Sequence, residues 1–182
     1  MIFVSYPKKH MSKIRNIILI LILVLAPLSC KKIRQLPPEP VISFTGFSMF
    51  DSTDILGNRH KAGILAFYFE DGDGDIGLVQ PYVGDNNPDT TNLTFYLYEK
   101  ENGFFTTPSD TLGYRIPYME RIGQNQILQG TIEITFLYIG YNESDTLLYE
   151  FFIEDRAGNI SNTSESCEII FTGEGGCLSE EI

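Results

Sequence analysis

Three aspartates stand at alternate positions in the stretch FEDGDGDIG, which covers residues 69–77. Asp71, Asp73 and Asp75 are separated by Gly72 and Gly74, and glycine lets the backbone curl so that carboxylate oxygens converge. A set of hard oxygen ligands without histidine or cysteine favours Ca²⁺ over a transition metal. Repulsion among three close carboxylates also favours a bound cation. The stretch therefore predicts a calcium site.

The spacing imitates the first three ligands of an EF-hand calcium loop, but the match stops after them. That loop requires glycine at its sixth position and a bidentate glutamate at its twelfth, where this chain has Ile76 and Tyr82. A calcium site of another kind remains open. So does a simple solvated turn, in which Asp and Gly serve their usual turn roles and the charges discourage pairing between strand edges.

The stretch FFIEDRAGNIS, residues 151–161, has the same design as residues 67–77. In both, bulky apolar residues end in Glu-Asp, and a glycine follows three residues after the aspartate. We interpret the two stretches as strands that leave the same end of one β-sandwich, so that their loops meet. The second loop then adds the carboxylate of Asp155 and the side-chain oxygen of Asn159 as candidate calcium ligands.

The acidic residues also raise the question of glycoside hydrolysis, which needs two carboxylates about 5–10 Å apart around a sugar site. Glu70 and Glu154, at the matching strand ends, could form such a pair. However, the chain has no tryptophan for a sugar platform, and we expect both carboxylates to be solvated. After residue 29 the single histidine is His60, in a polar loop, and no serine-nucleophile motif occurs. We therefore expect no catalytic activity, with a carboxylate-dependent glycan-processing hydrolase or a glycan-binding accessory protein as the alternative.

The elements that must position these residues are predicted to be strands. Val, Ile, Phe, Tyr and Thr are abundant, turn residues recur, and no long segment shows the 3.6-residue period of a helix. Predicted strands cover residues 41–47, 63–70, 92–99, 104–106, 126–139, 146–154 and 168–172, and the connections 78–91 and 107–125 are predicted loops, with a short extra strand near residues 114–118. Asn102-Gly103 predicts a tight hairpin turn, and alternation places Phe95 on the core face of its strand, opposite Tyr96 and Tyr98. About seven strands with this spacing predict an all-β, two-sheet β-sandwich.

The first 29 residues predict a secretory signal. Lys13 and Arg15 precede an uninterrupted apolar stretch of 12 residues, 17–28. A helix of that length, at ~1.5 Å per residue, spans about 18 Å and is too short for the ~30 Å hydrocarbon core of a membrane. The order of basic residues, apolar stretch and small residue is that of a cleaved signal peptide. Met11 is the better candidate for the initiating residue.

Residues 28–30, LSC, resemble the lipobox of bacterial lipoproteins, apart from Pro27 at a position where that pattern has an aliphatic residue. The resemblance implies that Cys30 is lipidated and becomes the mature N-terminus, and a plain secretory signal with an incidental cysteine is the alternative. Residues 30–40, CKKIRQLPPEP, are basic and then proline-rich, which is typical of a short stiff tether. Residues 41–182 are then expected to form one domain.

Cleavage after residue 29 leaves 9 basic and 24 acidic residues, a net charge of −15. Such a surface disfavours nucleic acid and anionic lipid and is compatible with divalent cations. Besides Cys30, the cysteines are Cys167 and Cys177. In an oxidising compartment these two could form a disulfide that closes a short loop, or they could be two free thiols.

Residues 145–161, DTLLYEFFIEDRAGNIS, resemble the penultimate strand and following loop of bacterial immunoglobulin-like domains, with Tyr149 at the tyrosine-corner position. Together with the lipobox, the proline tether and DGDGDIG, this ending resembles lipoproteins common in Bacteroidota. The resemblance implies an immunoglobulin-like sandwich that acts as a binding or structural module of the cell envelope, with an envelope protein or a glycan as partner. In lipoproteins of this phylum, an acidic run after the lipidated cysteine resembles a surface-export signal. This chain has Lys31 and Lys32 at that place instead, which favours the periplasmic side of the outer membrane.

Overall fold

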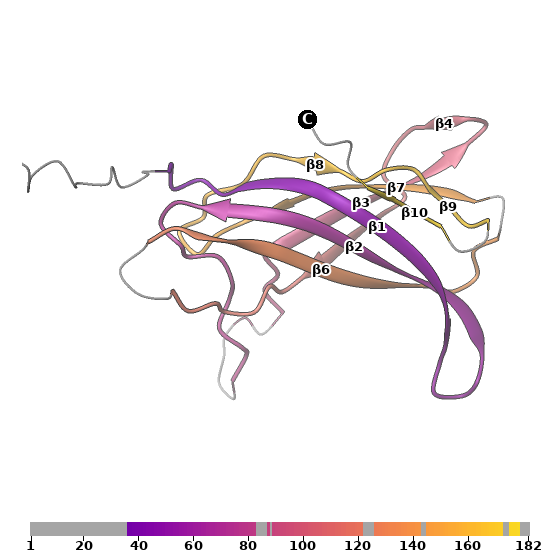
Figure 1. The fold of residues 1–182 in the computed structure, drawn as a ribbon, viewed down its shortest axis with the longest axis horizontal. Coiled ribbons are helices and arrows are strands. Elements are labelled where there is room, and N and C mark those ends of the chain that lie inside the picture. Colours follow the sequence, from indigo (N-terminus) through magenta and orange to yellow (C-terminus); the bar gives the residue numbers. More distant parts are fainter. Residues whose placement is uncertain are drawn as a thin grey trace, which may run out of the picture. The chain divides into compact units, whose positions relative to one another are not determined.

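The computed structural model describes residues 36–182, apart from residues 83–86, 88, 122–125, 143–144, 173–174 and 179–182. The predicted signal sequence (residues 1–29), the predicted lipidation site Cys30 and the first half of the predicted tether lie outside the described residues. Within the described ranges the chain forms ten strands in two antiparallel sheets and no helix (Figure 1). The prediction of an all-β fold is therefore confirmed, and the two sheets are consistent with a β-sandwich.

The first sheet contains the longest strands. Its order is β10-β1-β2-β6, with bounds Val41–Thr53 for β1, Arg59–Asp71 for β2, Leu128–Tyr138 for β6 and Gly176–Leu178 for β10. The β1–β2 pair runs in register from Val41 opposite Glu70 to Thr53 opposite Arg59, with one irregularity between Phe44 and Gly46. Residues near the turn of this hairpin project beyond the other strands, and Ile55 and Leu56 are exposed at its tip (Figure 1).

The second sheet is centred on two strands of alternating apolar residues. Strand β3 (Leu93–Glu101) pairs with β7 (Thr146–Ile153), so that Leu93 faces Ile153 and Leu97 faces Tyr149. Four shorter strands extend this pair: β4 (Phe104–Phe105) and β5 (Asp110–Tyr114) on the side of β3, and β8 (Ser164–Glu165) and β9 (Ile169–Ile170) on the side of β7.

Aromatic side chains from both sheets meet in the core. The rings of Phe67 on β2 and Phe151 on β7 lie 5.1 Å apart between centroids, and Phe95 on β3 is fully buried against both Phe151 and Phe136. The hydroxyl of Tyr149, the residue expected at a tyrosine corner, lies 3.4 Å from the hydroxyl of Tyr138. Period-2 alternation therefore delivers every second residue of the long strands to one shared interior.

The strand bounds depart from the sequence prediction where pairing, rather than hydrophobicity, decides them. Strand β1 continues past the predicted end at Phe47 to Thr53, because its polar residues pair with β2. Strand β5 lies earlier than the short strand expected near residues 114–118, and three short strands, β8, β9 and β10, replace the single one expected at residues 168–172. The Asn102-Gly103 turn joins β3 to β4 as predicted, with φ of 50° and 86°.

A disulfide joins Cys167, just before β9, to Cys177 in β10. It links the segment beside β7 in one sheet to the edge strand of the other sheet. The described part of the chain contains no helix long and apolar enough to cross a membrane.

Candidate metal centre

Four carboxylates meet at the end of the molecule where β2 and β7 finish. Asp71 is the last residue of β2, Asp73 and Asp75 follow in the next loop, and Asp155 stands two residues after β7. One oxygen from each of the four lies within 4.8 Å of the corresponding oxygens of the other three. The structure thus brings together the four aspartates that the sequence placed in two neighbouring loops.

The first loop is held in shape by its own first aspartate. Oδ2 of Asp71 accepts hydrogen bonds from the backbone N–H groups of Asp75 (2.8 Å) and Ile76 (3.2 Å). Ile76 is fully buried and anchors the loop in the core. The residue that rules out an EF-hand is therefore the one that fixes this loop to the sandwich.

The loop is packed against neighbouring segments of the chain. A Cβ at Gly74 would lie 2.1 Å from the carbonyl oxygen of Gln126, and one at Gly77 would lie 2.2 Å from that of Pro117; both glycines also have positive φ, +67° and +92°. Asp71 is fully buried and Asp155 is only 4% exposed. Asp73 and Asp75 between them are half-buried, so the loop is packed on one side and reaches solvent on the other.

The second loop is organised around Asp155. Its Oδ1 accepts a hydrogen bond from the backbone N–H of Asn159 and its Oδ2 one from Nδ2 of the same residue, both at 2.8 Å. The backbone N–H of Asp155 in turn donates to the carbonyl of Asn159 (3.0 Å). Asn159, which was predicted to offer its side-chain oxygen to a cation, here orients the carboxylate of Asp155.

Arg156 fastens the two loops together. Its Nη1 donates to the carbonyl oxygens of Gly77 (2.9 Å) and Ile76 (3.3 Å), and its backbone N–H donates to the carbonyl of Asp75 (3.4 Å). Its guanidinium lies 4.8 Å from the ring centre of Tyr118. Neither Arg156 nor Tyr118 has a role that follows from the sequence pattern alone. The sequence signal for a role of Arg156 is a single basic residue directly after an aspartate in an acidic loop.

Three oxygens in the cluster are buried and have no hydrogen-bond partner: one Oδ1 each from Asp71, Asp73 and Asp75. Burial, followed by the neighbouring carboxylates of Asp71 and Asp155, raises the pKa of Asp73. Burial and the charges of Asp155 and Asp73 also raise the pKa of Asp75, against a smaller opposing effect of Arg156. Unpaired buried oxygens are costly, and the cluster offers only the hard ligands that Ca²⁺ prefers. The residues therefore fit a divalent cation.

The other sequence candidates lie outside this group of four carboxylates. Glu70 is half-buried at the end of β2, whereas Glu154 is exposed after β7 and forms an isolated bridge with Ile160. His60 is half-buried in the projecting hairpin, at the other end of β2 from the aspartates. The carboxyl groups with raised pKa, Asp73 and Asp75, both belong to the cluster with Asp71 and Asp155.

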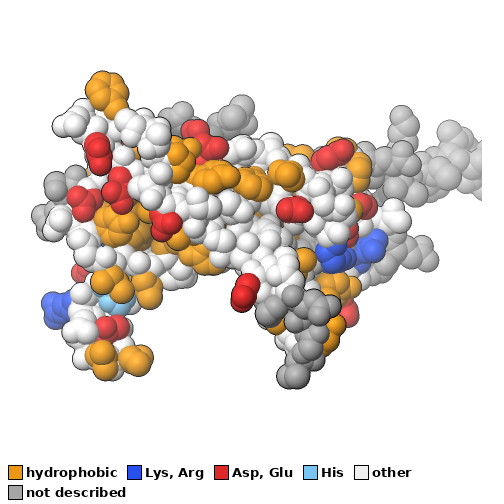
Figure 2. Space-filling view, turned by 180° about the vertical axis from the view of Figure 1, so that it is seen from behind, with side chains coloured by type: hydrophobic (Ala, Val, Ile, Leu, Met, Phe, Trp, Pro, Cys, Tyr) orange, Lys and Arg blue, Asp and Glu red, His pale blue; other side chains and the backbone are white. Residues whose placement is uncertain are grey.

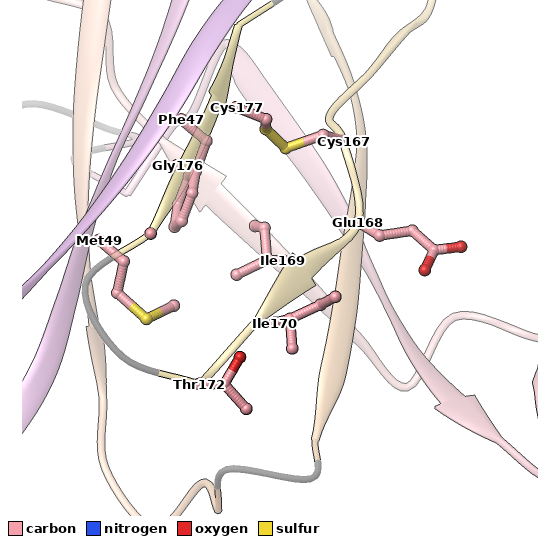
Figure 3. A pocket seen from close by; sticks show the side chains of 10 residues that line it. Phe47, Met49, Cys167, Glu168, Ile169, Ile170, Thr172, Gly176 and Cys177 are labelled. Atoms are coloured by element: carbon pink, nitrogen blue, oxygen red, sulfur yellow. A yellow bond between two sulfur atoms is a disulfide. The ribbon is translucent and has the colours of Figure 1, made fainter.

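A cavity of about 180 Å³ lies elsewhere, beside the disulfide. Phe47 and Met49 of β1 and Ile169 of β9 line it, and the Cys167–Cys177 bridge closes one side (Figure 3). The Glu168 side chain points away from it (Figure 3), and its carboxylate pairs with Lys100 at 2.7 Å. Ligand pockets typically measure ~300–1,000 Å³ and carry convergent polar groups. This cavity is therefore a gap in packing rather than a binding site.

Comparison with known proteins returns no relative. No protein-family model, no curated protein and no solved structure matches the chain. The function must therefore be argued from the geometry of the chain itself.

Proposed function

We propose that the chain is a calcium-stabilised, non-catalytic module of the immunoglobulin-like type, held at the cell envelope by a lipid on Cys30. The observation that carries the calcium part is the convergence of Asp71, Asp73, Asp75 and Asp155 with three buried oxygens that lack partners. In this proposal the four carboxylates bind the ion, Asn159 orients Asp155, and Arg156 joins the two loops.

Ca²⁺ suits this site better than other common cations. It takes 6–8 oxygen ligands at about 2.3–2.6 Å in flexible geometry, whereas Mg²⁺ demands a near-ideal octahedron and retains several waters. A transition metal would favour imidazole or thiolate, and neither stands in the cluster. An ion here would neutralise charge that burial makes costly, so its role is structural: it stabilises the end of the sandwich.

The immunoglobulin-like assignment is supported by strand order. Strands β1, β2 and β6 are neighbours in one sheet, and β5, β3, β7 and β8 follow one another in the other. An immunoglobulin-like sandwich likewise has its first, second and fifth main strands in one sheet and its third, sixth and seventh in the other. It also explains why the loops after β2 and β7 share an end.

A binding role is supported by the outer face of the second sheet. Tyr96 and Tyr98 on β3 point away from the core and are half-buried; Tyr96 lies against Phe152 of β7, and the Tyr98 hydroxyl donates to Glu150 (3.1 Å). Tyrosines bring contact area at low entropic cost, which suits an envelope protein or a glycan as partner. Acidic side chains are spread over the face in Figure 2, with Lys and Arg gathered at two places, which disfavours nucleic acid. The lipid anchor and its basic flank favour the periplasmic side of the outer membrane.

Thermal unfolding tests the calcium proposal directly. The purified chain is unfolded in EDTA and again in millimolar Ca²⁺, with near-ultraviolet circular dichroism as the signal. A ligand present at 100 times its Kd adds ~2.7 kcal/mol to the free energy of unfolding, which raises Tm by about 5–10 °C for a domain of ~150 residues.

The control is a chain carrying Asp73→Asn and Asp75→Asn, for which we expect no calcium-dependent shift. An unchanged Tm in the unmutated chain contradicts the proposal. A shift that persists in the double variant places the ion elsewhere.

A further inference from the structure

The predicted tether joins the sandwich at the metal loop. Gly72 lies between two of the candidate ligands, Asp71 and Asp73, and its backbone is packed against residues 36 and 37. A Cβ built on Gly72 would stand 2.1 Å from the carbonyl oxygen of Pro37 and 2.6 Å from that of Leu36. The loop that supplies three carboxylates therefore also forms the surface on which the last tether residues rest.

Pairing of the chain with the first sheet begins at Val41. Val41 pairs with Glu70 on β2, and the backbone N–H and carbonyl of Ile42 bond to the side chain of Asn162 at 2.8 and 2.9 Å. Pro40 is buried, whereas residues 37–39 are exposed. Prolines at positions 37 and 38 have no N–H to offer a sheet. Packing against Gly72 thus contributes to the position of residues 36 and 37.

We propose that the cation in the aspartate cluster controls where the tether becomes free. With Ca²⁺ bound, the loop is closed and Gly72 holds residues 36 and 37. Without the ion, repulsion among the unpaired carboxylates opens the loop and releases residues 36–39. The inference rests on the proposed calcium site and adds a regulatory consequence to it.

This release would change the distance and the orientation of the sandwich relative to the point at which the tether is attached. Four released residues lengthen the free tether by at most about 13–14 Å, at ~3.3–3.6 Å per extended residue. They also remove the contact that fixes its direction. Calcium would then set both the distance and the orientation at which the outer face of the second sheet is presented.

A nitroxide label at position 39 measures this release. Glu39 is exposed and close to the contact, and in a full chain carrying Cys30→Ser and Glu39→Cys the label has a single free thiol, because Cys167 and Cys177 form a disulfide. Spin-resonance spectra are recorded in EDTA and in millimolar Ca²⁺, while calorimetric titration of the same chain with Ca²⁺ measures binding. We expect a mobile spectrum in EDTA and an immobilised one with Ca²⁺.

The variant Gly72→Ala changes the contact with residues 36 and 37 and leaves all four candidate ligands in place. Gly72 is not among the glycines with positive φ, so alanine is acceptable to the backbone there, but its Cβ displaces residues 36 and 37. We expect this variant to bind Ca²⁺ with an affinity within about tenfold of the unmutated chain, 1.4 kcal/mol, while the label stays mobile with or without the ion. Gly175→Ala is the matched control, because a Cβ at Gly175 meets nothing within 4 Å, and it should leave the calcium response intact.

The outcomes separate the two proposals. Binding of Ca²⁺ with no change in label mobility overturns the inference and leaves the calcium site standing. Immobilisation by Ca²⁺ that persists in Gly72→Ala also overturns it, because the contact would then not be the link. Absence of calcium binding in the titration removes the calcium site itself, and the inference with it.

Discussion

The four aspartates of the cluster do not have the same task. Asp71 serves the fold as well as the ion, because Oδ2 bonds to two backbone N–H groups while Oδ1 is left without a partner. Asp155 is likewise fixed, by Asn159. Asp73 is the best probe of the ion alone, since its pKa is raised chiefly by burial and by neighbouring carboxylates.

We expect Asp73→Asn to act in opposite directions with and without calcium. In EDTA it removes one of several buried like charges, so Tm should rise; in titrations with Ca²⁺ it removes a ligand, so the affinity should fall by at least about tenfold, which is 1.4 kcal/mol. Thermal unfolding and calorimetry measure the two effects. The exposed Asp89→Asn is the charge-matched control. A lower Tm in EDTA would show that Asp73 supports the metal-free fold.

The rise in Tm that we expect for Asp73→Asn in EDTA should depend on pH. The pKa of Asp73 is raised in the folded state, so protonation favours folding: that contribution is complete below the unfolded pKa of about 3.9 and is lost as pH rises through the folded pKa. The advantage of Asp73→Asn over the unmutated chain should therefore be largest at neutral pH and shrink on acidification.

The four carboxylates were predictable because their signal is local: Asp71 and Asp155 each end an apolar run in Glu-Asp with glycine three residues later, and Asp73 and Asp75 alternate with glycine after Asp71. The role of Arg156 was not, because its partners Ile76 and Gly77 are remote in sequence and are backbone carbonyls, which leave no trace in residue type. Asn159 lies beside Asp155 as predicted, and its Nδ2 donates to that carboxylate. An amide must face a carboxylate with its donor nitrogen, but which carboxylate it faces is decided by the conformation of the loop.

At the scale of elements, Asn92 connects the second sheet to the metal loop. It stands just before β3 and is 5% exposed; its Oδ1 accepts from the N–H of Ile116 (2.8 Å), and its carbonyl accepts from the N–H of Glu154 (2.9 Å). Ile116 in turn accepts from the N–H of Leu78 (2.9 Å). One buried residue, through its side chain and its backbone carbonyl, thus supports both loops that supply the cluster.

We expect Asn92→Ala to lower the free energy of unfolding by about 1–3 kcal/mol, because it leaves the buried N–H of Ile116 without an acceptor. Denaturant unfolding in EDTA measures this, and Asn142→Ala, at an exposed position, serves as control. Calcium affinity should also fall, since the segment under Gly77 loses its support. Unchanged stability would mean that water or another acceptor replaces the amide.

The long strands could be read from the sequence and the short ones could not. Strands β2, β3 and β7 have eight or more residues of alternating burial, which is enough to show a period of two. Strands β8, β9 and β10 have two or three residues, too few for any period. Pairing with β7 and β1 creates them, so they are set by tertiary structure.

At the scale of the whole molecule, the net charge destabilises the folded state and the aromatic core stabilises it. The chain carries a net charge of −11, and self-repulsion of this kind weakens a compact state. The aspartate cluster brings four carboxylates together, two buried and two half-buried, and a bound cation would relieve their repulsion. The opposing stabilisation comes from an aromatic interior, in which the rings of Phe136 and Tyr149 stack at 4.6 Å between centroids.

The same interior predicts how the molecule responds to alkali. Burial is the main cause that raises the pKa of both Tyr138 and Tyr149, whose hydroxyls lie 3.4 Å apart in the core. A raised folded pKa means that the contribution of these phenols to stability is fully present below the unfolded value of about 10 and is lost as pH rises through the folded value. We therefore expect the protein to unfold at a lower pH than the one at which these two phenols would ionise inside the folded state.

Tyrosinate absorbance at 295 nm, recorded with near-ultraviolet circular dichroism from pH 9 to 13, should rise in two steps. Phenols outside the core ionise first, with the dichroism intact and full reversibility. The second step should coincide with loss of the dichroism, because the buried phenols meet solvent only on unfolding. The pair Tyr138→Phe and Tyr149→Phe should reduce the amplitude of the second step alone. A single smooth titration of all phenols with unchanged dichroism would contradict a sealed aromatic core, and with it the packing that holds the two sheets and their shared end loops in place.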